Sequence, residues 1–204
     1  MDILSEVIGR SSNEIYDETV REYYDNRTLI INDTITDGIL EDAILHILIW
    51  NKDDKDLPED KRKPIWLFID SDGGSVFAAH NLIEVIENSK TPIYGVAFSV
   101  AASAACSILI GCKKRYAFPH TMTLIHDGQL ALGVGTTNKQ KDTMKFMDRV
   151  DNMVREFIIE HTNITEEEYE DNKDREQYFF AEQAKEKGII DFIIGIDCSL
   201  DDIL

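Results

Sequence analysis

The chain has 204 residues, of which 43% are hydrophobic and 29% are charged, an ordinary balance for one globular domain. Its 39 acidic and 21 basic side chains leave a formal net charge of -18. A surface of this sign repels phosphate backbones, which argues against nucleic-acid binding. The polar start of the chain lacks the apolar core of a signal peptide, and three cysteines without metal-ligand spacing fit a reducing compartment. We therefore expect a cytoplasmic protein.

The first quarter of the chain divides into a polar segment and the start of the domain. Residues 1–25 show no clear period, so we expect a mobile segment or one engaged with a partner, followed by a single domain over 26–204. A β-branched run predicts a strand at 28–32, and apolar residues at helical spacing predict a helix over 38–50. The charged stretch 51–63 is expected to be a solvated loop.

The central segment is the most apolar part of the chain. A continuous apolar run at 65–69 predicts a strand covered on both faces, and a helix is expected over 76–88. The uncharged segment 91–112 is about as long as a membrane span. It contains proline, glycine, serine and many alanines, and few large apolar residues, which weakens insertion. We therefore expect a buried strand at 93–97 and a buried helix at 101–110.

The remaining elements continue the alternation of strand and helix. They are two short strands, a long helix, an acidic solvated segment, a short helix and a last strand, at 115–118, 122–125, 138–161, 166–175, 181–187 and 189–194. Gly188 fits a helix C-cap. Strand and helix in succession predict βαβ units and a mostly parallel sheet.

Three features of the sequence could carry chemistry. Ser103 lies among alanines at a strand-to-helix junction, where unpaired backbone N–H groups can stabilise an oxyanion; a small residue in a packed helix is the alternative. Two glycines within 70–76 follow a buried strand, where α/β sheets bind ligands, although a plain turn also fits. His126 ends an apolar strand and is either a general base or a structurally satisfied histidine. No group of residues has metal-ligand spacing, so no metal site is predicted.

The order of these features resembles the Clp protease proteolytic subunit family, over about residues 28–195. The residues that carry the resemblance are 69–76, 100–105, 114–115, 119, 125–126, 161–162, 181–184 and 188–191. The run 100–105 and the spacing between Ser103 and His126 are most similar to the phage-type branch.

The resemblance implies a role for four residues of this chain. It makes Ser103 the nucleophile and His126 the general base, and it makes the backbone N–H groups of Gly74 and Ala104 the oxyanion hole. The chemistry agrees, because a serine is inert until a base accepts its proton and the oxyanion needs preorganised donors. Ser99 also precedes a run of small residues, but only Ser103 has the Ala-Ala-Ser context and the expected distance to His126.

The sequence departs from the family pattern at two positions. The family usually has an aspartate as the third triad member, two positions before an aromatic residue, and an ungapped alignment puts Glu176 there. Glutamate can orient a histidine in such triads. Asp174 or Asp171 takes this role if the loop is shifted. Asp72 replaces the usual proline, and its negative charge near the oxyanion loop is expected to lower activity.

The resemblance also implies a fold, an activity and an assembly. The fold is crotonase-like α/β, with stacked ββα units around a parallel sheet and with the long helix and segment 128–135 projecting as a handle. The activity is that of a serine endopeptidase that cleaves unfolded polypeptides or peptides and uses no metal or organic cofactor. Subunits would form homo-oligomeric rings, a heptamer or double heptamer, that bury the apolar stripe of the long helix and the apolar segment 130–134. An AAA+ unfoldase would be a separate chain, because this one has no P-loop motif. Neither a nucleic acid nor a membrane is an expected partner.

Two other functions stay open from the sequence. The first is a non-catalytic ring subunit of the same family, suggested by Asp72 and Glu176. The second is a crotonase-type acyl-CoA enzyme, which shares the fold and the oxyanion geometry. A serine and a histidine at peptidase spacing have no required role in that second chemistry.

Overall fold

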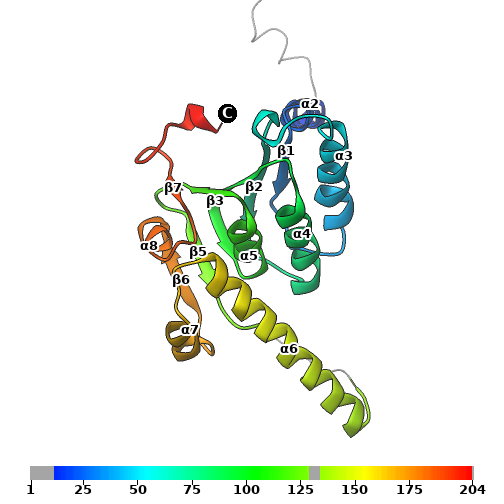
Figure 1. The fold of residues 1–204 in the computed structure, drawn as a ribbon, viewed down its shortest axis with the longest axis vertical. Helices are drawn as coiled ribbons and strands as arrows, with labels where there is room; N and C mark the ends of the chain where they lie inside the picture. Colours follow the sequence, from blue (N-terminus) through cyan, green and yellow to red (C-terminus); the bar gives the residue numbers. More distant parts are fainter. Residues whose placement is uncertain (1–11, 129–133, 204) are drawn as a thin grey trace, which may run out of the picture.

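A seven-stranded sheet forms the centre of this computed structural model, which describes residues 12–128 and 134–203 (Figure 1). Its strands are β1 (Thr28–Ile31), β2 (Ile65–Ser71), β3 (Ile93–Ala102), β4 (Lys114–Ala117), β5 (Met122–Ile125), β6 (Gln177–Phe180) and β7 (Phe192–Ile193). Five strands lie parallel in the order β1-β2-β3-β4-β7. β5 pairs in parallel with the end of β3, and β6 pairs antiparallel with β5. The predicted parallel sheet is confirmed, with one antiparallel strand added.

Seven α-helices are interspersed with the strands in the described residues, and five of them correspond to helices that the sequence predicts. The seven are α2 (Ser12–Asp25), α3 (Leu45–Asp53), α4 (Val76–Asn88), α5 (Ala104–Gly111), α6 (Thr137–His161), α7 (Glu166–Asn172) and α8 (Ala181–Glu186). A π-helical turn, Leu40–Ile44, precedes α3. Gly188 follows α8 with a φ of 69°, the left-handed conformation expected of a C-cap glycine. In the described residues, no helix combines the length and the apolar character needed to cross a bilayer.

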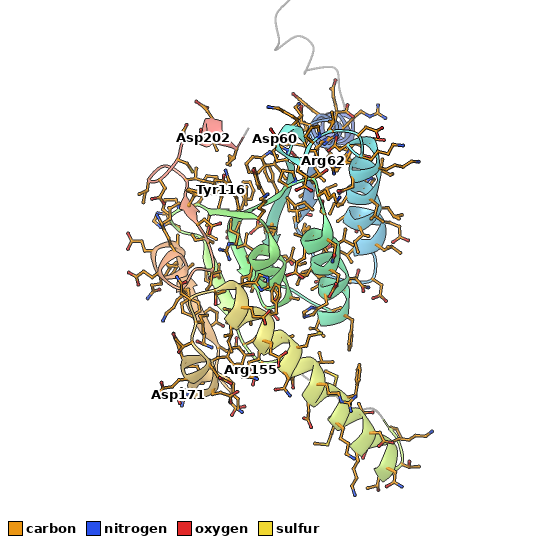
Figure 2. All side chains as sticks on the ribbon, in the orientation of Figure 1. Asp60, Arg62, Tyr116, Arg155, Asp171 and Asp202 are labelled. Atoms are coloured by element: carbon orange, nitrogen blue, oxygen red, sulfur yellow. The ribbon has the colours of Figure 1, made fainter. Side chains whose placement is uncertain are left out.

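The two faces of the sheet are covered differently. In β2, Ile65, Leu67 and Ile69 alternate with Trp66 and Phe68, and only the first set is completely buried, in the main core beneath the helices. The second face carries a half-buried aromatic layer, which packs around Tyr116 together with Ile203 from the C-terminal segment (Figure 2). The predicted cover of β2 on both faces is thus complete on the first face and partial on the second, where Trp66 and Phe68 are half-buried and Tyr23 of α2 contacts Phe68.

Several predicted boundaries are corrected by the structure. The helix expected at 101–110 begins at Ala104, because β3 continues through Ala102. The acidic segment 166–175, expected to be solvated, contains α7, whose Tyr169 is buried in the core. β6 is absent from the sequence-based prediction. Part of segment 1–25, for which no regular structure was expected, forms α2.

α6 projects from the body of the protein (Figure 1). Its C-terminal half packs against the chain's own core through Phe157 and Ile158. In its N-terminal half, Met144 and Phe146 are exposed. The core therefore covers the apolar stripe of the helix only toward its C-terminal end. Of the predicted projecting segment 128–135, residues 129–133 lie outside the described part of the chain.

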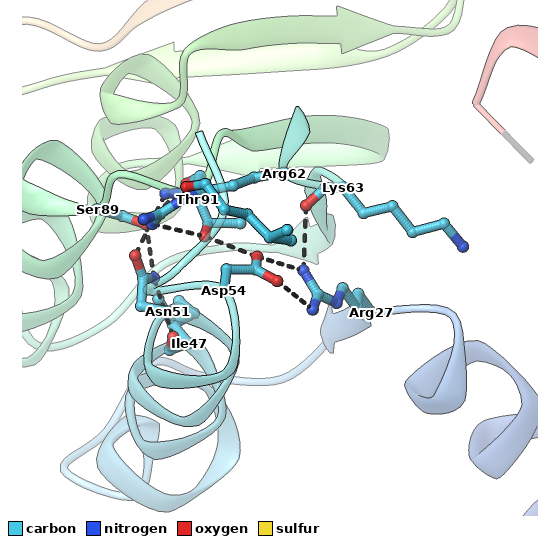
Figure 3. A network of polar contacts seen from close by, with 9 residues as sticks. Arg27, Ile47, Asn51, Asp54, Arg62, Lys63, Ser89 and Thr91 are labelled. Atoms are coloured by element: carbon cyan, nitrogen blue, oxygen red, sulfur yellow. Dashed lines mark hydrogen bonds and ion pairs between the residues drawn. The ribbon is translucent and has the colours of Figure 1, made fainter. Parts of the chain in front are cut away.

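A buried ion pair lies in the charged stretch 51–63, which was expected to be a solvated loop (Figure 3). The Arg27 guanidinium donates two hydrogen bonds to the Asp54 carboxylate, at 2.6 and 2.8 Å. The Thr91 hydroxyl donates a third, at 2.9 Å, and Arg62 donates to the same hydroxyl. Because the Asp54 side chain is only 4% exposed, these bonds replace its hydration and attach the stretch to the sheet.

The first prediction concerns this ion pair. The hydrogen bonds that Arg27 donates to Asp54 lower the pKa of this carboxyl group, and burial partly opposes the effect. The contribution of the ion pair to stability is therefore present above the pKa of an unfolded aspartate, near 4, and is lost as pH falls through the pKa of Asp54 in the folded state. We expect Asp54→Asn to lower the free energy of unfolding by about 3 kcal/mol at pH 7, and by less at pH 3.

Urea unfolding at one fixed protein concentration measures both differences. Asp53→Asn is the matched control, because this substitution removes the same charge from an exposed neighbouring position. An Asp54→Asn effect that equals the control, or that grows as pH falls, contradicts this account of the ion pair.

Candidate active site

Ser103 occupies the sharp turn between β3 and α5. Its backbone has a φ of 54° and a ψ of -124°, a region that non-glycine residues rarely adopt and that costs about 1–3 kcal/mol. The turn is held on both sides, because the Ser103 N–H donates to the Leu124 carbonyl at 2.9 Å and its own carbonyl accepts from Ser107 N–H. The side chain therefore lies at the N-terminus of α5, so the alternative of a serine inside a packed helix is excluded.

A continuous chain of hydrogen bonds joins three sequence-predicted residues. Ser103 Oγ lies 2.8 Å from His126 Nε2, and His126 Nδ1 lies 3.0 Å from Glu176 Oε1. A carboxylate can only accept, so Nδ1 carries the proton and Nε2 is free to accept from the serine hydroxyl. The imidazole is mostly buried, whereas Glu176 is about half exposed. This arrangement can remove a proton from a serine and stabilise the imidazolium that results.

Strand register explains why Glu176 lies beside the histidine. β5 and β6 are antiparallel, and Ile125 pairs with Gln177 at the end of the ladder. The next cross-strand position brings together His126 and Glu176, because each lies one residue beyond this last pair. Asp174 lies two residues farther along, where its charge raises the pKa of Asp127 in addition to the larger effect of burial.

The other acidic candidate, Asp171, is exposed near the end of α7 (Figure 2). In the described structure, neither Asp171 nor Asp174 has a hydrogen bond to the histidine. Ser99 is exposed in β3, where its N–H donates to Asp70, and it does not line the cleft at Ser103.

The paired glycines form a tight approach to the serine turn. Gly73 and Gly74 have φ values of 99° and 151°, and the Ile35 N–H donates to the Gly73 carbonyl. A Cβ on Gly73 would lie 2.6 Å from the Ala102 carbonyl oxygen, and one on Gly74 would lie 2.3 Å from that of Ile35. Within the described chain, the N–H groups of Gly74 and Ala104 donate to no other group. Both donors are therefore available to an oxyanion next to the serine.

A cleft of about 530 Å³ opens beside Ser103 and His126. Gly74 and Ala104 also line it, and Asp72 lies exposed at its rim. Its apolar lining comes from α4, β5 and α6, and consists of Val76, Phe77, Leu124, Ile125, Met147, Val150, Val154 and Ile158. The cleft is thus large enough for a side chain and continuous with the serine hydroxyl.

Neither of the two buried cysteines, nor a metal site, competes with this arrangement in the described residues. Burial raises the pKa of both Cys106 and Cys112 to about 12, which keeps them protonated at neutral pH. No three His, Cys, Asp or Glu side chains in the described ranges form a set that could hold a metal ion.

Two features of the site were missed from the sequence. The three consecutive aromatic residues at 178–180 are a strand signal that could have identified β6, Gln177–Phe180. Asp151 on α6 also lines the cleft, and a single helix sequence holds no signal for which neighbour its faces contact.

The family follows from comparisons with known proteins. Residues 10–197 match the model of the Clp protease family. The chain belongs to this family. It is 30% identical to the ATP-dependent Clp protease proteolytic subunit 2 of Corynebacterium efficiens, covering 91% of this chain and 88% of that one. It is 32% identical to the subunit of the same name from Prochlorococcus marinus (strain NATL2A), covering 82% of each chain.

The fold has a solved counterpart. The structure of a mutant of ClpP1 from Listeria monocytogenes matches with a TM-score of 0.74 at 24% identity, covering 91% of this chain and 99% of that one. The predicted ClpP-type fold is confirmed by this likeness. Membership of the phage-type branch stays a prediction.

The second prediction tests the close approach of the glycine turn. Gly73 and Gly195 both have left-handed φ values, but a Cβ on Gly195 would meet nothing within 4 Å. We expect Gly195→Ala to lower the free energy of unfolding by about 1 kcal/mol, the cost of the backbone conformation alone. Gly73→Ala should cost about 2 kcal/mol more, because the new methyl group displaces the Ser103 turn. Equal losses in denaturant unfolding would show that the predicted clash does not matter.

Proposed function

We propose that this chain is a serine endopeptidase subunit in which Ser103 is the nucleophile, His126 the general base and Glu176 the residue that orients the base. The observation that carries this proposal is the hydrogen-bond chain Ser103–His126–Glu176, which opens onto a cleft beside two free backbone N–H groups. In its first step, His126 Nε2 takes the hydroxyl proton as Ser103 Oγ attacks the scissile carbonyl carbon. The carbonyl electrons move to oxygen, where the N–H groups of Gly74 and Ala104 stabilise the charge.

The remaining steps use the same residues. The His126 imidazolium, stabilised by Glu176, gives its proton to the amide nitrogen as the C–N bond breaks. This leaves an acyl ester on Ser103 and a free amine. A water molecule then gives a proton to His126 and adds to the ester. When this second intermediate collapses, the proton returns to Ser103 Oγ and the carboxylic acid product is released.

The relatives support the substrate class and the assembly. Their names describe proteolytic subunits of ATP-dependent Clp proteases, so we propose unfolded polypeptides or peptides as substrates and a separate ATP-driven unfoldase as a partner. We also propose that the chain acts in the cytoplasm as a homo-oligomeric ring. The non-catalytic alternative has less support, because the contact of Glu176 with His126 is the one that a working triad needs.

The third prediction tests the nucleophile and the base. Ser103→Ala should lower kcat for a fluorogenic peptide by at least roughly a thousandfold, because it removes the attacking oxygen. His126→Ala should have a similar effect, and the double variant should be no slower, because the two residues act as a unit. Circular dichroism shows whether each variant is folded. Undiminished turnover by folded Ser103→Ala protein would overturn the assignment.

The fourth prediction distinguishes the acidic candidates. Glu176→Gln should lower kcat by about a hundredfold or more, because an amide favours the wrong histidine tautomer. Asp174→Asn removes the same charge two residues away and should leave kcat within about twofold. Glu176→Asp should also lower kcat, because the shorter side chain no longer reaches Nδ1. If Asp174→Asn abolishes turnover and Glu176→Gln does not, Asp174 is the third member.

The fifth prediction concerns assembly. Exposed apolar residues occur on α3 (Leu45, Leu48 and Ile49) and on α6 (Met144 and Phe146), and such surfaces mark interfaces. Light scattering should therefore give a mass several times that of the chain at micromolar concentration. Phe146→Glu should reduce this mass, whereas Asn152→Glu, at an exposed polar position on the same helix, should not. A monomeric wild-type protein would contradict the ring. The segment 130–134, which we also expected to be buried between subunits, lies outside the described residues except for Val134.

A further inference from the structure

The cleft beside Ser103 has an acidic residue in its apolar wall. Five residues of α6 line this wall at helical spacing: Met147, Val150, Asp151, Val154 and Ile158. They lie at positions i, i+3, i+4, i+7 and i+11, so they form one stripe of the helix. Four members of the stripe are apolar. Asp151 therefore places a carboxylate on a surface that otherwise suits hydrocarbon.

The Asp151 carboxylate lies at the histidine end of the cleft. A Cβ built on Gly128 would be 3.8 Å from Asp151 Oδ1, so this oxygen lies against the backbone two residues after His126. Among the described residues that line the cleft, the ionisable side chains are Asp72, His126 and Asp151, and none is lysine or arginine. The cleft is thus apolar with negative charge and without a cation of its own.

The cation on the next turn of α6 after Asp151 is engaged elsewhere. Arg155 lies one turn away, at i+4, but its guanidinium pairs with Glu166 at 2.6 Å and with Glu170 at 3.8 Å, both on α7 (Figure 2). Burial raises the pKa of Asp151, and the charge of Asp148 raises it further. Both effects disfavour the carboxylate, whereas a positive charge that entered the cleft would favour it.

We propose that Asp151 selects substrates with lysine or arginine as the residue that supplies the scissile carbonyl. This inference rests on the proposed peptidase function and adds a substrate class to it. Lysine and arginine carry a long aliphatic stem below a charged head. The stem would pack against Met147, Val150 and Val154, while the head pairs with the carboxylate. A purely apolar side chain packs against the same wall but gains no ion pair with the exposed Asp151.

Two matched peptides test this selection. They differ only at the residue before the scissile bond, which is lysine in one and norleucine in the other, so the stem is constant and only the ammonium changes. We expect the wild-type protein to cleave the lysine peptide with a kcat/KM about fivefold higher. Asp151→Asn should bring this ratio to about one, mainly by lowering kcat/KM for the lysine peptide.

Asp148→Asn is the matched control for this test. It removes the same charge from an exposed position one turn away on α6, outside the cleft lining, so the ratio should stay close to the wild-type value. Equal kcat/KM values for the two peptides in the wild-type protein would overturn the proposal. So would a preference that survives in Asp151→Asn, or one that falls equally in Asp148→Asn.

A binding measurement keeps this inference separate from the proposed function. Calorimetry with Ser103→Ala protein compares product peptides that end in lysine or in norleucine, and it needs no turnover. Tighter binding of the lysine peptide that is lost on adding Asp151→Asn supports the selection, even if neither peptide is hydrolysed by the wild-type protein. Absent hydrolysis refutes only the peptidase proposal, whereas equal binding refutes the selection.

Discussion

The candidate site depends on the antiparallel pairing of β5 with β6. Ile125 opposes Gln177, so the residues just beyond this pair, His126 and Glu176, meet across the end of the ladder. Because side chains alternate along a strand, a slip of one residue would turn Glu176 to the other face of the sheet. The third member of the hydrogen-bond chain is therefore determined by register.

The same strand connects the histidine to the serine. β5 pairs in parallel with the end of β3, and the Leu124 carbonyl accepts the Ser103 N–H at the turn. This bond helps to hold the strained Ser103 backbone, and Gly73 packs against the turn from the other side, where a side chain would collide with it. Three adjacent segments thus constrain one hydroxyl group. Such constraint from the surroundings is what allows a strained residue to persist.

Much of this site could be predicted from the sequence. Three local signals identify it: the alanine-flanked Ser103, the glycine pair and His126. Their order along the chain indicates the fold. β6 was missed although its three aromatic residues favour a strand. The buried Tyr169 of α7 was missed because an acidic stretch resembles a solvated loop until its tertiary contacts are known. Asp54 was missed for the same reason, since its partner Arg27 is distant in sequence. An alignment alone left Glu176 and Asp174 as alternatives, whereas strand register separates their positions.

The central claim is that the base next to Ser103 activates this hydroxyl. Treatment with a fluorophosphonate, followed by mass spectrometry of the intact chain and of its peptides, tests this most directly. The account predicts one adduct per chain, on Ser103, which is lost in folded His126→Ala protein. An unmodified folded protein, or an adduct that maps to another serine such as Ser99, would contradict it.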